Sequence, residues 1–303
     1  TDTTAGPLDQ VFELACERAA VRGIRVTGSE LVGMIPLQIM LVTGRYLLKK
    51  QHLSTVISDE QIIKIAVKSL GLDDLTPFDP KKKIIEYQME DHSEKKLVEM
   101  TITEFANETS SESPAPGGGS VSACMGAFGA ALGTMVANLS AHKKGWDDRW
   151  EEFSDWAEKG KHYSERLLTL TDEDTQAFNA IMTAFGLPKN TEEEKALRSE
   201  AIQAATKQAM EIPFQVMQTA YGAMKMVKAM AETGNPNSVT DAGVGGLALR
   251  SAVLGAGLNV KINASGLEDK KFVAEMLEKT EDLERKAELL EKEILEIVTN
   301  KIS

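Results

Sequence analysis

Three carboxylates in one short stretch are the side chains of this sequence best suited to moving protons. They lie in Thr171-Asp172-Glu173-Asp174-Thr175. Asp174 comes four residues after Leu170 and four before Phe178, so on a helix it points towards the apolar side. Burial makes a carboxylate costly to ionise, and the raised pKa that results suits general acid–base catalysis. The alternative is a buried Asp174 that is satisfied by bonding a loop.

A glycine-rich loop is the second candidate, because it lets a ligand approach the backbone closely. Gly117, Gly118 and Gly119 carry no side chain, and Ser120 is predicted to cap the helix that follows. The free N–H groups in the first turn of that helix could hold an anion. The alternative is a flexible connection between helices. A phosphate-binding P-loop is excluded, since the Gly-Lys-Ser/Thr ending is missing.

Two lysines and three other polar side chains could bind a polar or anionic ligand. Lys143 and Lys144 follow the end of the same predicted helix, where they could hold carboxylates or simply complement the helix dipole. Asn235 and Asp241 flank a turn and a helix start, and plain turn or capping roles are the alternative. Asn259 adds an amide to an otherwise apolar stretch.

The remaining titratable residues form no pattern typical of a metal site or a nucleophilic triad. The four His have no HxxxH or HExxH spacing and the two Cys lie far apart, so neither a metal nor a disulfide scaffold is predicted. The formal net charge of −12 excludes the basic footprint of a nucleic-acid binder, although a local basic pocket stays open. The sparse Cys usage favours a reducing, cytoplasmic compartment.

The elements that must position these residues divide into two parts. Residues 1–89 contain both helix and strand patterns. Helices are expected at 8–20, 36–48 and 60–70, the last capped by Asp59, and short strands at 23–26 and 83–87. The charged stretch 90–96 is predicted to be a linker. Residues 97–303 form a second domain, a helical bundle, with helices expected near 94–108, 119–142, 147–185, 191–232, 236–258 and 268–301.

Two of the predicted helices have informative faces. Small residues on the helix near 119–142 predict close packing against another helix: Gly126, Gly129, Ala130 and Gly133. This helix has no charge from Val121 to Ala141, which is long enough to span a bilayer, but its weak hydropathy favours a buried helix over a membrane span. An apolar seam marks the last helix: Val273, Met276, Thr280, Leu283, Ala287, Leu290, Ile294 and Ile297.

Taken in order, these residues resemble the formiminotransferase-cyclodeaminase family, folate enzymes of histidine degradation. The resemblance is carried by Ser113–Ser122, Leu139–Lys144, Asp172–Asp174 with Ala177-Phe178, Leu187-Pro188-Lys189 with Glu192-Glu193, Gly234–Ser238 with Asp241, and Asn259 with Ile262-Asn263. Residues 1–90 are similar to the end of the family's transferase half, through Gly28–Gly33, Pro36-Leu37, Phe78-Asp79-Pro80 and Ile84–Tyr87.

The resemblance implies a mainly α protein, in which a small α+β fragment of a formiminotransferase domain precedes a helical cyclodeaminase domain. Such a domain closes 5-formiminotetrahydrofolate to 5,10-methenyltetrahydrofolate and releases ammonia, with the tetrahydrofolate derivative as its substrate and no metal. It forms a homodimer or a larger homo-oligomer around its ligand site.

The resemblance also implies roles for the candidate residues. The family's catalytic aspartate falls on Asp174, and Lys143 and Lys144 suit the glutamate tail of folate, with or without polyglutamylation. The other expected contacts to the substrate are Gly117, Gly118, Gly119, Ser120, Asn235, Asp241 and Asn259.

Two other functions remain open: a methenyltetrahydrofolate cyclohydrolase on the same fold, and a non-catalytic folate-binding or assembly module. The family's transferase half is much longer than residues 1–90, and its catalytic histidine lies in the part that has no counterpart here. The sequence also opens Thr1-Asp2-Thr3 without an initiator Met. We therefore expect a truncated transferase half that cannot transfer the formimino group by itself and that exposes an unpaired sheet edge.

Overall fold

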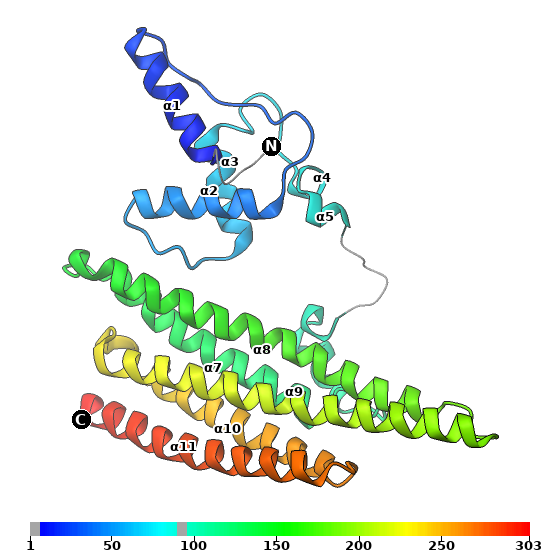
Figure 1. The fold of residues 1–303 in the computed structure, drawn as a ribbon. Helices are drawn as coiled ribbons and strands as arrows, with labels where there is room; N and C mark the ends of the chain where they lie inside the picture. The colour runs from blue at the N-terminus through cyan, green and yellow to red at the C-terminus, as the bar shows by residue number, and fades with distance from the viewer. Residues whose placement is uncertain (1–6, 90–95) are drawn as a thin grey trace. The chain divides into compact units, whose positions relative to one another are not determined.

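The computed structural model describes residues 7–89 and 96–303, which divide into two compact units. The first unit draws its described residues from 7–89 and 144–154, and the second from 96–143 and 155–303. Helices build both units (Figure 1). The predicted linker falls almost entirely on residues 90–95, which lie outside the described residues.

The N-terminal unit contains three main helices and two short ones: α1 Leu8–Val21, α2 Leu37–Lys50, α3 Asp59–Leu70, α4 Pro80–Lys83 and α5 Ile85–Met89. The three predicted helices are confirmed. Ser58, not Asp59, caps α3, because the Ser58 hydroxyl accepts the N–H of Gln61 and the Gln61 side chain accepts the N–H of Ser58. Apolar side chains of α2 and α3 form the core of this unit, among them Met40 and Ile62.

The two strands predicted for this unit are wrong. Residues 23–26 follow the turn after α1 without forming a strand, and Asp79 and Pro80 begin a helical turn that takes up residues 80–83. One parallel bridge, between Ile35 and Ile84, is all the β-pairing among residues 7–89. Two short apolar runs do not make a sheet unless further strands satisfy their backbone groups. The described part of the chain is therefore mainly helical, and the α+β fragment is not seen.

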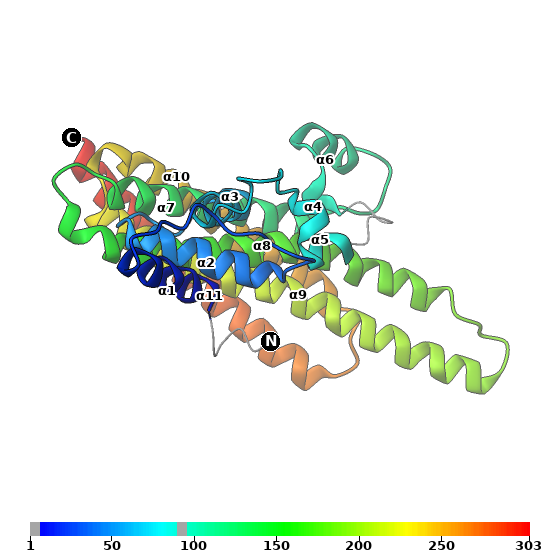
Figure 2. The same cartoon turned by 90° about the horizontal axis from the view of Figure 1, so that it is seen from above.

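The C-terminal unit is a bundle of helices: α6 Ile102–Thr109, α7 Gly118–Ala141, α8 Trp150–Phe185 (its residues 150–154 belong to the first unit), α9 Glu192–Thr233, α10 Val239–Ala264 and α11 Lys270–Ile302. Short 3-10 turns precede three of them, at Leu97–Glu99, Asp147–Arg149 and Pro236–Ser238. Every helix predicted for this part of the chain overlaps one of these. Helices α7 to α11 lie lengthwise beside one another, and α8 and α9 extend past the others where they join (Figures 1 and 2).

Close helix packing explains the glycines of α7 and α10. A Cβ at Gly129 would lie 2.8 Å from the carbonyl oxygen of Gly245, so the two helices approach backbone to backbone. All four members of the predicted small-residue face are buried, as expected. The predicted seam of α11 is also largely buried, but at its end Val298 is buried and Ile297 is only partly covered. A step of four follows Ile294 because an α-helix has 3.6 residues per turn.

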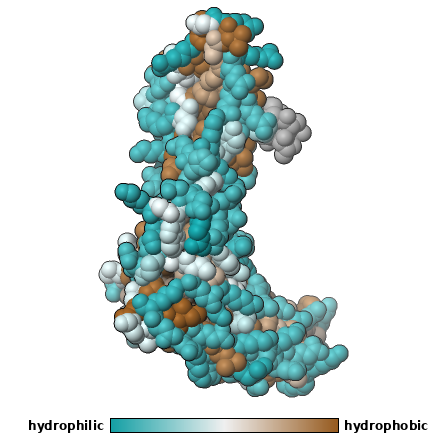
Figure 3. All heavy atoms as spheres, turned by 90° about the vertical axis from the view of Figure 1, so that its left-hand side faces the viewer, coloured by the Kyte–Doolittle hydropathy of each residue, from teal (hydrophilic) through white to brown (hydrophobic). Residues whose placement is uncertain are grey.

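Two stretches, Gly118–Ala141 and Pro236–Ala264, are long and apolar enough to cross a membrane. Their most apolar windows are 61% and 50% buried inside the protein, which agrees with core helices of a bundle. The absence of a membrane span stays a prediction. The surface drawn in Figure 3 is mostly hydrophilic and is interrupted by apolar patches.

Candidate functional site

Asp174 on α8 is held against the first turn of α7. Its Oδ2 accepts a hydrogen bond from the Ser120 hydroxyl at 2.9 Å, and the backbone N–H of Ser120 donates to the same carboxylate. Burial raises the pKa of Asp174, while the two bonds from Ser120 oppose that rise. Asp174 is thus a partly buried carboxylate whose negative charge is stabilised by hydrogen bonds from Ser120. Opposing effects of this kind suit a group that both gains and loses a proton.

The prediction that Ser120 caps α7 is wrong. The helix begins at Gly118 with Gly117 at the cap position, and no side chain of the loop caps it. Ser120 is the third residue of the helix, so its backbone N–H has no partner within the helix. The carboxylate of Asp174 fills that role from α8, where the positive end of the helix dipole also favours a negative charge.

Gly119 makes room for this contact. A Cβ at position 119 would lie 2.5 Å from the carboxyl carbon of Asp174, closer than real Cβ atoms approach. Gly118 borders a second polar group, since a Cβ there would lie 3.4 Å from the amide nitrogen of Asn259. The structure therefore brings the predicted glycine loop, Ser120, Asp174 and Asn259 together at one end of α7.

The two other carboxylates of the predicted cluster have separate partners. Asp172 accepts the backbone N–H of Leu97 at 2.8 Å, and burial raises the pKa of Asp172 against this bond. Glu173 forms an ion pair with Arg166 at 2.7 Å, and Arg166 also donates to Gln215 on α9. Asp174 is thus the member of the cluster that faces the glycine loop.

The remaining predicted residues lie at the other end of α7. Lys143 and Lys144 come directly after its C-terminal end, where the backbone N–H of Asn235 donates to the Ser140 hydroxyl at 2.7 Å. The Asn235 side chain accepts the N–H of Asn237, which is the capping role that the sequence left open. Asp241 belongs to the first turn of α10.

The two ends of α7 are far apart. The helix has 24 residues, so its ends lie about 36 Å from each other at 1.5 Å per residue. The predicted site residues therefore fall into two groups, one with Asp174 at the start of α7 and one with Lys143 and Lys144 after its end. The helix predicted near 119–142 already implies this separation, because the glycine loop precedes it and the lysines follow it.

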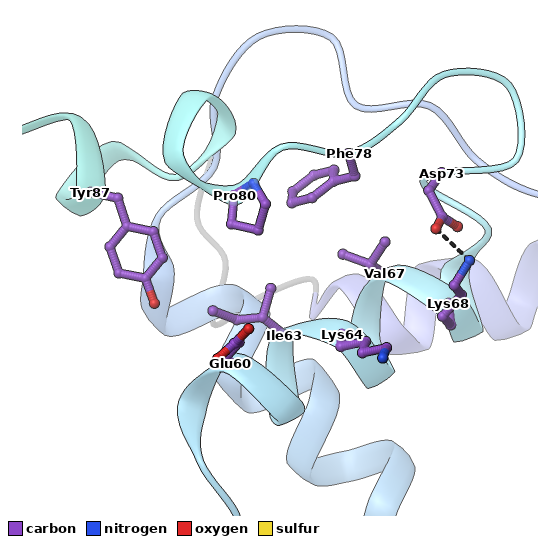
Figure 4. Close-up of a pocket in the computed structure, with 9 residues that line it drawn as sticks. All are labelled: Glu60, Ile63, Lys64, Val67, Lys68, Asp73, Phe78, Pro80 and Tyr87. Atoms are coloured by element: carbon purple, nitrogen blue, oxygen red, sulfur yellow. Dashed lines mark ion pairs between the residues drawn. The ribbon is translucent and has the colours of Figure 1, made fainter.

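Sequence reasoning missed two hollows that none of the predicted site residues lines. The larger, of about 280 Å³, lies in the N-terminal unit between α3 and the 78–87 segment. Figure 4 shows its apolar walls, with the ion pair between Lys68 and Asp73 at one end and Tyr87 at the other. The smaller, of about 100 Å³, lies between the 97–105 segment, α7 and α8.

Neither cysteine nor metal chemistry finds support at these places. Cys124 lines the smaller hollow, and burial raises the pKa of its thiol, which disfavours the reactive thiolate. Within residues 7–89 and 96–303 no group of three His, Cys, Asp or Glu side chains could hold a metal ion. That the site needs no metal stays a prediction.

Comparison with known families matches both parts of the chain. A model described as formiminotransferase-cyclodeaminase matches residues 101–282, and a model of the formiminotransferase domain matches residues 1–90.

Comparison with individual proteins gives relatives with two different names. The chain is 36% identical to the formimidoyltransferase-cyclodeaminase of Mus musculus over 88% of its length and 49% of the relative's. It is also 38% identical to the methenyltetrahydrofolate cyclohydrolase of Methylorubrum extorquens. That match covers 67% of this chain and 98% of the cyclohydrolase. The chain thus spans about half the length of the formimidoyltransferase-cyclodeaminases that it matches.

A solved structure agrees with the helical fold. The crystal structure of formiminotetrahydrofolate cyclodeaminase from Thermotoga maritima matches with a TM-score of 0.60 and 27% sequence identity. The match covers 67% of this chain and 98% of the other.

Proposed function

Because the chain belongs to the formiminotransferase-cyclodeaminase family, we propose that its helical unit is a formiminotetrahydrofolate cyclodeaminase with Asp174 as the catalytic acid–base. The observation that carries the proposal is the placement of Asp174: a partly buried carboxylate at the start of α7, beside a glycine loop that leaves the backbone bare. The relatives named above are enzymes of folate chemistry, which gives the substrate class.

The reaction needs one proton moved from one nitrogen to another. N10 of the folate attacks the carbon of the protonated N5-formimino group and loses its proton, and the departing nitrogen takes up a proton and leaves as ammonia. The product is the 5,10-methenyl cation, so charge and atoms balance without an added oxidant or reductant. A single carboxylate at the ring-forming carbon can serve as base in the first step and as acid in the second. We assign both steps to Asp174.

The direct test supplies 5-formiminotetrahydrofolate to the purified chain. We expect the absorbance of the methenyl product to rise while ammonia is released in equal amount. Binding of the folate without any turnover would instead favour the non-catalytic binding or assembly module.

A cyclohydrolase is the second candidate, favoured by the match to 98% of the Methylorubrum extorquens enzyme. That reaction adds water to the methenyl carbon and opens the ring, so Asp174 would deprotonate water. Methenyltetrahydrofolate supplied alone separates the two functions. Rapid loss of its absorbance, together with no ammonia from the formimino substrate, would identify a cyclohydrolase.

We further propose that the complete site forms between two copies of the chain. The separation of Asp174 from Lys143 and Lys144 along α7 supports this proposal, because an antiparallel second copy would bring the proton-transfer end of one chain to the lysine end of the other. Exposed apolar side chains on α7 and α10 give such a copy a surface to cover: Phe128, Leu139, Val244, Leu258 and Ile262.

Mixing two defective variants tests the shared site. D174N and the K143A/K144A double variant each damage one half of the proposed site, and a mixed dimer contains one site with both halves intact. We expect activity to return on mixing and exchange of subunits. No return of activity, although light scattering shows mixed dimers, would place each site within one chain.

Phe128→Glu tests the interface, since Phe128 is 54% exposed on α7. We expect a monomer with little activity. Leu197→Glu is the matched control. Leu197 is apolar and 60% exposed, but it belongs to α9, which is not part of the proposed interface. A dimeric, active F128E variant would contradict the interface.

The transferase activity of the chain is a separate proposal. We expect no transfer of the formimino group from formiminoglutamate to tetrahydrofolate, because the family's catalytic histidine has no counterpart in residues 1–90. Formation of 5-formiminotetrahydrofolate in that assay would contradict this expectation.

A further inference from the structure

We propose that Ser120 and Thr175 are positioning residues that form a directed hydroxyl chain onto Asp174, fixing which carboxylate oxygen carries the proton. This inference rests on the cyclodeaminase function proposed above. It concerns two residues whose hydroxyls contact each other, of which Ser120 also donates to the carboxylate, and it adds Thr175 to the site.

The position of Ser120 in the first turn of α7 explains why its hydroxyl leaves the helix. Later hydroxyls of α7 donate to the carbonyl four residues earlier, as Ser122 does to Gly118 and Ser140 to Val136. Four residues before Ser120 the chain has not yet entered the helix. The Ser120 hydroxyl therefore reaches across to α8, and since Ser120 is fully buried it depends on that partner.

The hydrogen bonds have a defined direction. Ser120 Oγ has one proton, and the ionised carboxylate has none, so that proton lies on the 2.9 Å bond to Asp174 Oδ2. The Ser120 and Thr175 hydroxyl oxygens lie 3.1 Å apart, so Thr175 must be the donor in that second bond. The hydrogen bonds therefore run from Thr175 to Ser120 and from Ser120 to Asp174, and each donor strengthens the next bond.

The hydrogen-bonded hydroxyls occupy one oxygen of Asp174 and leave the other for proton transfer. Ser120 occupies Oδ2 whether the carboxyl group is charged or neutral, since a neutral carboxyl still accepts through that oxygen. Oδ1 lies against the bare backbone of Gly119, where a Cβ would clash with it, and we assign to this oxygen the transfer of the N10 proton to the departing nitrogen. The same atom then acts in both steps, and the carboxylate need not rotate between them.

The surrounding charged groups leave Ser120 as the main support for the charge of Asp174. Helix α7 has no charged residue between Gly118 and Ala141. The charged residues nearest in sequence are engaged elsewhere: Asp172 with the backbone of Leu97 beside Lys96 and Glu99, and Glu173 with Arg166. Lys261, two residues after Asn259 on α10, pairs with Glu284. Loss of the Ser120 hydroxyl should therefore act directly on the ionisation of Asp174.

The test is the pH profile of kcat/KM in Ser120→Ala. Removing a donor to the charged form raises the pKa of Asp174, so the acidic limb should move up by about one pH unit. We expect kcat to fall about ten-fold with KM nearly unchanged, because positioning affects proton transfer and leaves binding intact. Thr175→Val should move the limb in the same direction by less, and Thr175→Ser, which keeps a hydroxyl, should restore it.

Ser164→Ala is the matched control. Its hydroxyl donates to the carbonyl of Ala127 on α7 at 3.1 Å, so the variant makes the same change at a helix contact outside the site. Its acidic limb should coincide with that of the wild type. If Ser120→Ala does not fold, judged by its circular dichroism, Thr175→Val and Thr175→Ser carry the test.

A second readout does not depend on turnover. The carboxyl ¹³C signal of Asp174, assigned by its loss in D174N, reports the ionisation directly, and its midpoint should rise in Ser120→Ala. If neither the acidic limb of the kcat/KM profile nor the ¹³C midpoint moves in Ser120→Ala or Thr175→Val, the proposed hydroxyl chain is wrong. An inactive wild type whose ¹³C midpoint does shift on mutation would overturn the proposed function and leave the chain of hydroxyls standing.

Discussion

Asp174→Asn is the substitution that best separates catalysis from structure. The amide has the shape of the carboxylate and keeps one oxygen, so it can still accept from the Ser120 hydroxyl and backbone N–H. It cannot take up a proton at neutral pH. Asp174→Ala differs, because it leaves the buried hydroxyl and the N–H at the start of α7 without their partner.

The two variants should differ in stability as well as in activity. Loss of the acid–base group should lower kcat by about 10²–10⁴-fold in both. Burial raises the pKa of Asp174, so the folded chain holds the proton more tightly than the unfolded chain does. The contribution of Asp174 to stability is then complete below its ordinary pKa of about 4 and is lost as the pH rises through the raised value.

At neutral pH the ionised carboxylate thus costs some stability, and the neutral amide should not. We expect the free energy of unfolding of D174N to equal or exceed that of the wild type, or to fall below it by no more than about 1 kcal/mol. Such a loss corresponds to a decrease in Tm of roughly 2–4 °C. D174A should lose about 1–3 kcal/mol through its unsatisfied donors.

Parallel assays of ammonia release and thermal unfolding at pH 7 decide the matter. An active D174N variant would refute proton transfer by this residue. A D174N variant as unstable as D174A would show that the charge itself caps α7 and would refute the account of the pKa.

Three further predictions follow from the site. Gly119→Ala should lower kcat by about 10²-fold, since its Cβ would displace the catalytic carboxylate, and a near-normal kcat in the turnover assay would contradict that contact. Replacing Lys143 and Lys144 by Ala should raise KM about ten-fold with little change in kcat, most strongly for polyglutamylated substrate, whereas an unchanged KM would exclude the lysines from binding. Asp172→Ala should free the backbone of Leu97 and speed proteolysis within residues 97–112 about ten-fold, and equal cleavage rates would show that this bond does not hold the segment.

Periodicity predicted most of the bundle and the inward direction of Asp174. The stretch of α8 from Leu170 to Phe178 has a regular apolar spacing, and the structure forms a helix there. The small residues of α7 likewise predicted close packing, which the approach of Gly129 to Gly245 confirms. These are local patterns, and local patterns determine which face of a helix is buried.

Features that depend on distant partners could not be predicted in the same way. The strand expected at 83–87 needed neighbouring strands, and without them Asp79 and Pro80 start a helix. Ser120 was expected to cap α7 from within the loop, but the cap comes from Asp174, 54 residues later in the chain. What the sequence could not show is that Asp174 contacts the start of α7, which places it far from the lysines that follow the end of that helix.

The most direct test of the central claim is the time course of ammonia and methenyl product from 5-formiminotetrahydrofolate, with wild type and D174N side by side. We predict equal amounts of the two products from the wild type and at least a hundred-fold slower formation of both in D174N. Equal rates in the two proteins, or methenyl hydrolysis without any ammonia, would contradict the assignment of Asp174 as the acid–base of a cyclodeaminase.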